Sequence, residues 1–144
     1  INPPVLRNLP VNLSNSTEEV KVDESAISKL IDNYEKSLVN AINSGKFSLV
    51  EKCLTPGSNL YKSQKNLVAN LYKKGTKEKL VDFKVKDIKT TSKPNVYQVY
   101  VTEKIGIKRD DKADFAVSEF KWIYTVVFDG TKYSLSDIAK WDGK

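Results

Sequence analysis

The chain has 144 residues, of which 40% are hydrophobic, a size and composition typical of one globular domain with its own core. Its 24 basic and 18 acidic residues give a formal net charge of +6, but only Arg7 and Arg109 are arginines. Because bidentate contacts to phosphates and base edges favour arginine, this composition argues against specific nucleic-acid recognition. The scattered lysines indicate a solvated surface or, alternatively, loose attraction to an anionic polymer or a membrane surface.

Histidine is absent and Cys53 is the single cysteine. The chain therefore lacks the usual general base near neutral pH and the commonest transition-metal ligand, and it can form no intrachain disulfide. We expect no catalytic residue, no cofactor and no metal site. No apolar run has the length needed to span a bilayer, so we expect any membrane attachment to lie in a segment outside this chain.

Residues 1–22 hold three of the five prolines and only scattered apolar positions. Since proline removes a backbone donor and breaks helices, this stretch is predicted to be an extended linker or arm. The folded domain is predicted to cover residues 23–144.

Three amphipathic helices are predicted next. Asp23 can cap the first, whose apolar residues recur at helical spacing until Gly45 ends it. A shorter helix follows over residues 48–54. Ser58 begins a third helix, which ends at Gly75.

The apolar period then changes to two, which predicts β-strands. We expect strands over residues 80–90, 96–107 and 115–128, and a hairpin that leads into a fourth strand. In the second of these strands, Glu103 shares a face with the apolar residues at 97, 99, 101, 105 and 107. The fold class is therefore α+β, with three N-terminal helices packed on a curved four-stranded antiparallel meander.

Asp129-Gly130 lies between two β-rich runs and is typical of a two-residue type I′ hairpin turn. In that register Phe128 faces Thr131 and Tyr124 faces Leu135. Side chains at alternate positions of the third strand, including Trp122, then share one aromatic and aliphatic face. This face is either a packed core or the lining of a ligand pocket, and we favour the core.

Glu103 and Glu119 form the main polar feature of the predicted sheet. A symmetric turn between their strands places them opposite each other, with Lys121 diagonal to Glu119. The three are either a paired-carboxylate site with raised pKa or an exposed cluster in which Lys121 offsets the repulsion. We favour the exposed cluster, because no further ligand is evident and a register error of two residues separates the pair.

Three sequence patterns together resemble the NTF2-like fold. They are Tyr34-x-x-x-Leu38-x-x-Ala41-Ile42-Asn43-x-Gly45-x-Phe47, Leu60-Tyr61-x-x-Gln64, and Phe120-x-x-x-Tyr124 followed by Asp129-Gly130-x-x-Tyr133-x-Leu135-x-Asp137-Ile138. Over about residues 23–141, the chain resembles the C-terminal NTF2-like domain of TcaA-type membrane-anchored envelope proteins of Gram-positive bacteria.

The resemblance implies a cone-shaped, extracytoplasmic domain carried on a membrane helix outside this chain, with roles near cell-wall polymers or in envelope stress and glycopeptide response. The superfamily also contains ketosteroid isomerase-like and dehydratase-like enzymes that use Asp, His or Tyr as acid and base. Because this sequence has no histidine and no acidic residue that can be assigned to the cone, no catalytic residue is carried over.

The leading functional hypothesis is a non-catalytic extracytoplasmic domain of a cell-envelope protein, which contacts anionic wall polymer or another envelope protein. The alternative is a small-molecule carrier or an enzyme that uses the concave sheet face around Tyr100, Phe120, Trp122 and Tyr124. A solvent-open pocket with a buried carboxylate favours this alternative. A third hypothesis is a homodimer formed through the second sheet face, on the basis of the apolar residues Val99, Val101, Ile105 and Ile123.

Overall fold

The computed structural model describes residues 22–144, so all but the last residue of the predicted linker lies outside the described residues. Within this range three helices precede four strands: α3 (Glu24–Ser44), α4 (Ser48–Glu51), α5 (Asn59–Lys73), β2 (Lys77–Thr90), β3 (Val96–Lys108), β4 (Ala116–Phe128) and β5 (Tyr133–Lys140). The strands form one antiparallel sheet in the order β2-β3-β4-β5. The predicted α+β order of elements is confirmed.

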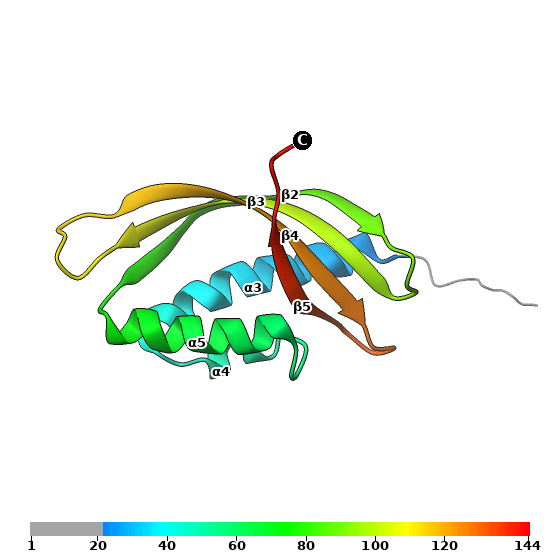
Figure 1. The fold of residues 1–144 in the computed structure, drawn as a ribbon, viewed down its shortest axis with the longest axis horizontal. Coiled ribbons are helices and arrows are strands. Elements are labelled where there is room, and N and C mark those ends of the chain that lie inside the picture. The colour runs from blue at the N-terminus through cyan, green and yellow to red at the C-terminus, as the bar shows by residue number, and fades with distance from the viewer. Residues whose placement is uncertain (1–21) are drawn as a thin grey trace, which may run out of the picture.

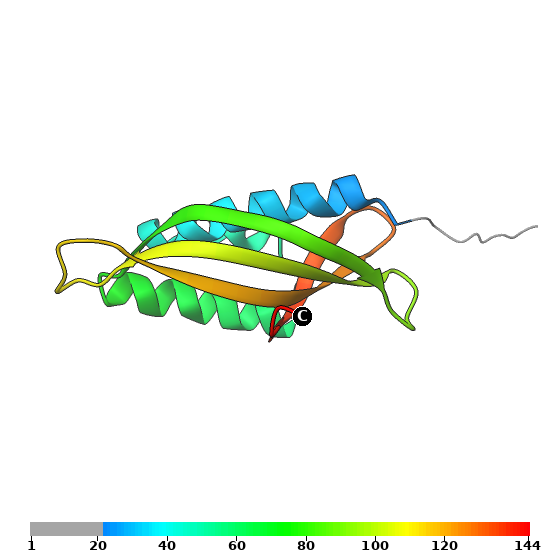
Figure 2. The same ribbon diagram turned by 90° about the horizontal axis from the view of Figure 1, so that it is seen from above.

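The sheet is a single curved layer, and the helices cover one of its faces (Figure 1). From above, α3 runs along the β2 side of the sheet and α5 along the opposite side (Figure 2). Accordingly, α3 makes most of its sheet contacts with β2, whereas α5 contacts β5. The core lies between these two layers.

Caps fix the ends of the two long helices as predicted. The Asp23 side chain accepts a hydrogen bond from the Ala26 amide at 3.0 Å, and Ser58 accepts one from the Tyr61 amide at 3.2 Å. At the end of α3, Gly45 has φ of +72° and donates to the Ala41 carbonyl at 2.8 Å. This left-handed conformation favours glycine, so Gly45 ends the helix where the sequence predicts.

Helix α4 is shorter than the predicted segment over residues 48–54. It ends at Glu51 because the chain that follows pairs with β5. The Leu135 amide donates to the Cys53 carbonyl at 2.9 Å, and the Thr55 amide donates to the Leu135 carbonyl at 2.8 Å. In a longer helix, the Cys53 carbonyl and the Thr55 amide would instead form hydrogen bonds within the helix.

Strand β3 alternates as predicted, and its inner residues Val99 and Val101 are fully buried in the core beneath the helices. Ile105 is also buried. The homodimer hypothesis needs all three side chains on an exposed face, so its structural basis is wrong. Ile123 pairs with Tyr100 and lies on the other face.

Strand β2 begins at Lys77, three residues before the predicted start. Its inner residues Phe83 and Val85 are half-buried as the alternation predicts, but Val81 is 48% exposed. The register with β3 shifts between Leu80 and Asp82, so one extra residue is inserted there. Such a β-bulge turns the Val81 side chain away from the core.

The hairpin between β4 and β5 has a four-residue turn over residues 129–132, so the predicted two-residue turn is wrong. Phe128 pairs with Tyr133 rather than with Thr131. The cause is the Asp129 carboxylate, whose Oδ1 accepts hydrogen bonds from the amides of Thr131 at 2.8 Å and Lys132 at 2.9 Å. An aspartate that captures the amides after it stabilises a wider turn.

A second irregularity lies in β5, where the register shifts between Thr125 and Val126 of β4. Beyond this point Tyr124 pairs with Ile138, not with Leu135 as predicted. The bulge allows both Leu135 and Ile138 to face the helices, since it changes the alternation by one residue.

Candidate functional site

A partly open cavity of about 350 Å³ lies between the sheet and the two long helices. Every element except α4 contributes to its walls. The lining residues are Tyr34, Leu38, Ile42, Gln64, Leu67, Glu78, Glu103, Ile105, Phe120, Trp122, Tyr124 and Ile138. Half-buried side chains such as Leu67, Phe120 and Trp122 lie at its margin, beside the part of β4 that β5 does not reach.

Alternation along β4 brings three of the four predicted pocket residues to this cavity. Phe120, Trp122 and Tyr124 all point to the helix side of the sheet. The rings of Phe120 and Trp122 stack with centroids 5.6 Å apart and an interplanar angle of 10°. Tyr124 packs edge-on against Tyr34 of α3, with centroids 5.3 Å apart. One wall of the cavity is therefore lined by aromatic rings.

The placement of Tyr100 in the predicted pocket is wrong. It lies between the buried residues Val99 and Val101, so its side chain points to the outer face of the sheet. There it packs edge-on against Trp141, with centroids 5.3 Å apart, and the Lys89 ammonium lies 4.7 Å from its ring centre. The C-terminal segment thus folds back on the sheet through Trp141.

The predicted cluster of Glu103, Glu119 and Lys121 does not form. Glu103 pairs with Phe120, and Glu119 pairs with Lys104, one position away from the predicted register. A shift of one residue moves a side chain to the opposite face of the sheet. Glu103 therefore points into the cavity, whereas Glu119 and Lys121 are exposed on the outer face.

The carboxyl group that Glu103 meets belongs to Glu35 of α3, which the sequence analysis did not single out. Glu35 is only 2% exposed and Glu103 only 9%. Oε1 of Glu103 accepts a hydrogen bond from Nε1 of Trp122 at 3.0 Å. Glu35 follows Ile27 and Ile31 at a spacing of four, so it lies in the apolar stripe of the helix. This position in the sequence could have predicted that its carboxyl group is buried.

Burial and the neighbouring Glu103 carboxylate together raise the pKa of Glu35 to about 10. Glu35 therefore keeps its proton at neutral pH and can donate it in a hydrogen bond to Glu103. Burial, helped by the charge of Glu103, also raises the pKa of Glu78 to about 7. Glu35 is therefore protonated at neutral pH, whereas Glu78 gains or loses its proton near neutral pH, because Glu35 is the more deeply buried of the two.

Two buried tyrosines complete the polar part of the cavity. The hydroxyl of Tyr34 accepts a hydrogen bond from Nε2 of Gln64 at 2.7 Å. Burial raises the pKa of Tyr34 and of Tyr124 well above the ordinary value, so both hydroxyls stay neutral. Within residues 22–144, no three carboxylate or cysteine side chains converge in a metal-binding arrangement.

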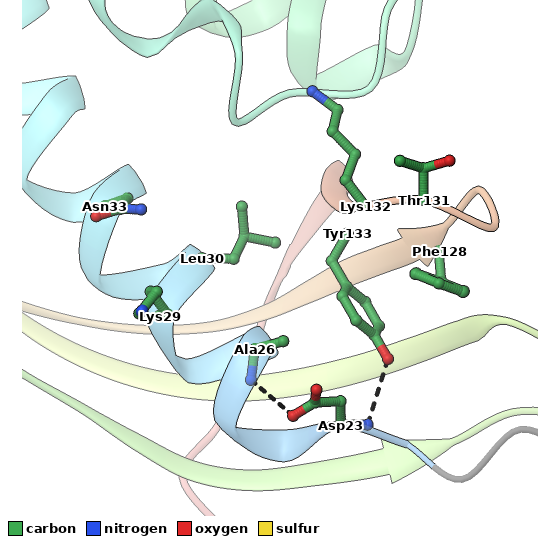
Figure 3. A pocket seen from close by; sticks show the side chains of 9 residues that line it. All are labelled: Asp23, Ala26, Lys29, Leu30, Asn33, Phe128, Thr131, Lys132 and Tyr133. Carbon is green, nitrogen blue, oxygen red and sulfur yellow. Dashed lines mark hydrogen bonds between the residues drawn. The ribbon is translucent and has the colours of Figure 1, made fainter.

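A larger and shallower hollow of about 600 Å³ lies between the start of α3 and the β4–β5 hairpin (Figure 3). Lys29 and Lys132 line it, and the Asp23 amide donates to the Tyr133 hydroxyl at 3.3 Å. Asp23 is already engaged as the cap of α3. Because the buried Glu103 and the half-buried Glu78 line the cavity under the sheet, we identify that cavity as the candidate site.

The family comparison agrees with this architecture. The family model described as the TcaA protein NTF2-like domain matches residues 23–139. The chain belongs to this family. The matched range begins at the Asp23 cap and ends one residue before the end of β5, so it contains the three helices, the first three strands and all of β5 except Lys140.

Two curated relatives of this TcaA NTF2-like domain are similar to it in sequence. The uncharacterised membrane protein YvbJ of Bacillus subtilis is 28% identical over 87% of this chain, which spans 20% of YvbJ. The uncharacterised protein BpOF4_00885 of Alkalihalophilus pseudofirmus is 26% identical over 67% of this chain, which spans 60% of that protein. Among the described residues, no helix is long and apolar enough to cross a membrane.

Two solved structures share the fold. The intermembrane space region of the chloroplast protein ARC6 has a TM-score of 0.71 at 12% identity. The match includes 84% of this chain and 98% of the ARC6 region. An NTF2-like protein of unknown function from Shewanella oneidensis has a TM-score of 0.50 at 13% identity and covers 78% of this chain and 96% of its own. At these identities the likeness concerns the fold alone.

Proposed function

We propose that this TcaA NTF2-like domain is a non-catalytic, extracytoplasmic binding domain of a membrane-anchored envelope protein, and that it holds a small ligand in the cavity under the sheet. The observation that carries the proposal is the combination of an aromatic wall with a buried carboxyl group in one partly open cavity. Small-molecule sites are typically mostly apolar clefts of about 300 to 1,000 Å³ with a few placed polar groups. The similarity to the membrane protein YvbJ supports the attachment to a membrane.

The polar groups of the cavity suit binding better than proton transfer. Gln64 holds the Tyr34 hydroxyl and Trp122 holds the Glu103 carboxylate, so each is fixed in orientation by a neighbouring side chain. Glu78, with a pKa of about 7, is the group best suited to act as a general base. Glu78 is half-buried, like the stacked rings of Phe120 and Trp122, and no histidine lies among the residues that line the cavity to act with it. We therefore favour a carrier or sensor over an enzyme.

The test uses benzyl alcohol as a neutral probe of cavity size. In a Trp141→Phe variant of the full chain, the fluorescence comes from Trp122, which lines the cavity. Cavities of about 150 Å³ already take benzene, so benzyl alcohol should enter and change the Trp122 emission in a saturable way. Leu67→Phe should weaken this binding because Leu67 lies at the cavity margin, whereas Leu49→Phe, at an exposed position outside it, should not. Unchanged emission at saturating probe would refute the cavity as a binding site.

The lysine-rich surface supports a second candidate, binding of anionic wall polymer. The described residues contain a single ion pair, Lys36 with Asp32 at 3.1 Å, so most lysines are not neutralised by a carboxylate. Lys84 and Lys121 flank Thr102 in one row across the outer face. The neighbouring row carries Asp82 and Glu119 on either side of Lys104, and its net negative charge weakens the positive field there.

This candidate predicts retention of the full chain on purified Gram-positive cell wall. Retention should fall when salt is added and when teichoic acid is removed, because exposed charges are screened by ions. A double Lys84→Gln, Lys121→Gln variant should be retained less than a Lys36→Gln control. Retention that is indifferent to both salt and teichoic acid would eliminate the polymer as a partner.

A further inference from the structure

The charged groups of the cavity have one sign. Glu78 and Glu103 line it and Glu35 contacts Glu103, but the lining contains no lysine or arginine. Of the two lysines next to Glu78, Lys77 directs its ammonium to the Asn43 carbonyl at 2.8 Å, and the Lys79 ammonium lies 4.6 Å from the centre of the Phe115 ring. A buried carboxylate without a cation is costly, and folded proteins normally pair such charges. The cavity therefore has an unmatched negative charge.

The hydrogen bonds of the two glutamates are also incomplete. Oε2 of Glu103 and Oε2 of Glu35 are both buried, and neither accepts a hydrogen bond from an N–H group or a hydroxyl among residues 22–144. The proton that Glu35 retains can bridge the two carboxyl groups, but it leaves the charge of Glu103 uncompensated. An N–H donor that also carries a positive charge would satisfy both needs of Glu103.

The aromatic wall favours the same kind of ligand. Phe120 and Trp122 stack at the margin of the cavity, and Nε1 of Trp122 is bonded to Glu103. Aromatic faces attract cations, and tryptophan does so most strongly. A ligand with an apolar or aromatic body can lie against this wall while its charged end reaches Glu103.

We propose that the cavity binds an organic amine, with the protonated amino group bonded to Glu103 and the apolar body against Phe120 and Trp122. This inference rests on the proposed function and narrows it to one ligand class. Simple metal cations are a poorer match, because no metal-binding arrangement of carboxylates forms within the described residues.

The experiment compares three probes of nearly equal size, benzylamine, benzyl alcohol and benzoate, which differ in charge at neutral pH. Binding to the full chain carrying Trp141→Phe is followed by Trp122 emission. Benzylamine should bind about tenfold more tightly than benzyl alcohol, and benzoate most weakly, because a charge-assisted hydrogen bond to Glu103 forms with the amine alone. Equal affinities for benzylamine and benzyl alcohol would overturn the amine assignment and leave the proposed function standing. No binding of any probe would overturn both.

Substitutions test whether Glu103 causes the preference for benzylamine. Glu103→Gln should remove the preference for benzylamine while leaving benzyl alcohol within about twofold. Glu119→Gln is the matched control, since it removes the same charge from the outer face of the neighbouring strand. If Glu103→Gln does not fold, Glu78→Gln serves instead and should lower the preference by about threefold at mildly alkaline pH. A preference for benzylamine that survives these substitutions in a folded protein contradicts the assignment.

Discussion

At the scale of single residues, the least expected feature is Glu35. A carboxyl group in the apolar stripe of a helix would destabilise the fold if it were ionised there. The structure avoids this cost because burial and the charge of Glu103 keep Glu35 protonated, with a pKa of about 10. The other groups that act on its charge are Glu78 in β2 and Tyr34, its neighbour in α3. None of these groups carries a positive charge, so each of them favours the protonated form of Glu35.

This property predicts how stability depends on pH. In the unfolded chain Glu35 loses its proton near its ordinary pKa of 4.5, whereas in the folded protein it keeps the proton up to about pH 10. The folded state therefore binds the additional proton between these values, and the resulting stabilisation is lost as pH rises through that window. Glu78 acts in the same direction up to about pH 7. Stability should thus fall from weakly acidic to alkaline pH.

Glu35→Gln should remove most of this dependence, because an amide has no proton to lose and can still donate a hydrogen bond to Glu103. At about pH 8.5 the variant should be more stable than the parent chain by on the order of 2 kcal/mol, and near pH 4 the two should be similar. Urea unfolding of both proteins at the two pH values measures this difference. Parallel pH profiles for the two proteins would show that Glu35 is ionised in the folded state.

At the scale of elements, periodicity and capping residues were sufficient to predict each helix and strand. They succeeded because burial of one face imposes a fixed spacing on a helix or a strand. The bulges were not predictable in this way, since an inserted residue such as Val81 looks like part of the same alternating run. The Asp129 turn was missed for a related reason: the Asp-Gly pair fits two turn lengths, and the hydrogen bonds to Thr131 and Lys132 decide between them.

The end of α3 provides a prediction about helix termination. A Cβ atom added to Gly45 would lie 2.6 Å from Cδ2 of Tyr72, whereas one added to Gly57 would have no heavy atom within 4 Å. Both glycines have nearly the same positive φ, +72° and +74°, so the backbone strain of an alanine should be similar at the two sites. Gly57→Ala should cost about 1 kcal/mol, and Gly45→Ala at least about 2 kcal/mol. Chemical denaturation of both variants tests this, and equal losses would mean that the Tyr72 ring moves aside freely.

Asn43 joins α3 to the sheet and provides a second prediction at this scale. Its side chain donates to the Glu78 carbonyl at 2.7 Å and accepts from the Glu78 amide at 2.8 Å. Asn43→Ala should therefore cost about 2 kcal/mol, since it leaves two part-buried backbone groups without partners. Asn40→Ala, one turn earlier on an exposed position of the same helix, should change stability by less than about 0.5 kcal/mol. Similar unfolding midpoints for the two variants would contradict this role of Asn43.

At the scale of the molecule, the sequence predicted the layers better than the site. Alternation in β4 was enough to group Phe120, Trp122 and Tyr124, because that rule operates within one strand. Placing Glu103 beside Glu35 requires knowing how a helix and a strand separated by many residues lie across the core, and no local pattern contains that information. Tyr100, in contrast, was placed wrongly although its strand contained the information. Alternation along β3 puts Tyr100 on the face opposite Val99, and therefore outside the cavity.

A single core predicts a single unfolding transition. Residues from the three helices and from β3, β4 and β5 form one contiguous hydrophobic cluster, in which Val99 and Leu135 are fully buried, and partly buried residues of β2 pack against it. Small domains with one core usually unfold in an all-or-none manner. In the Trp141→Phe variant, Trp122 reports on the sheet and the cavity, while far-ultraviolet circular dichroism reports mainly on α3 and α5. The two signals should give the same midpoint in urea, since neither layer can keep its apolar face buried without the other. Loss of the Trp122 signal before the helical signal would instead mean that β4 detaches from helices that remain folded, and the cavity would then be the weakest part of the molecule.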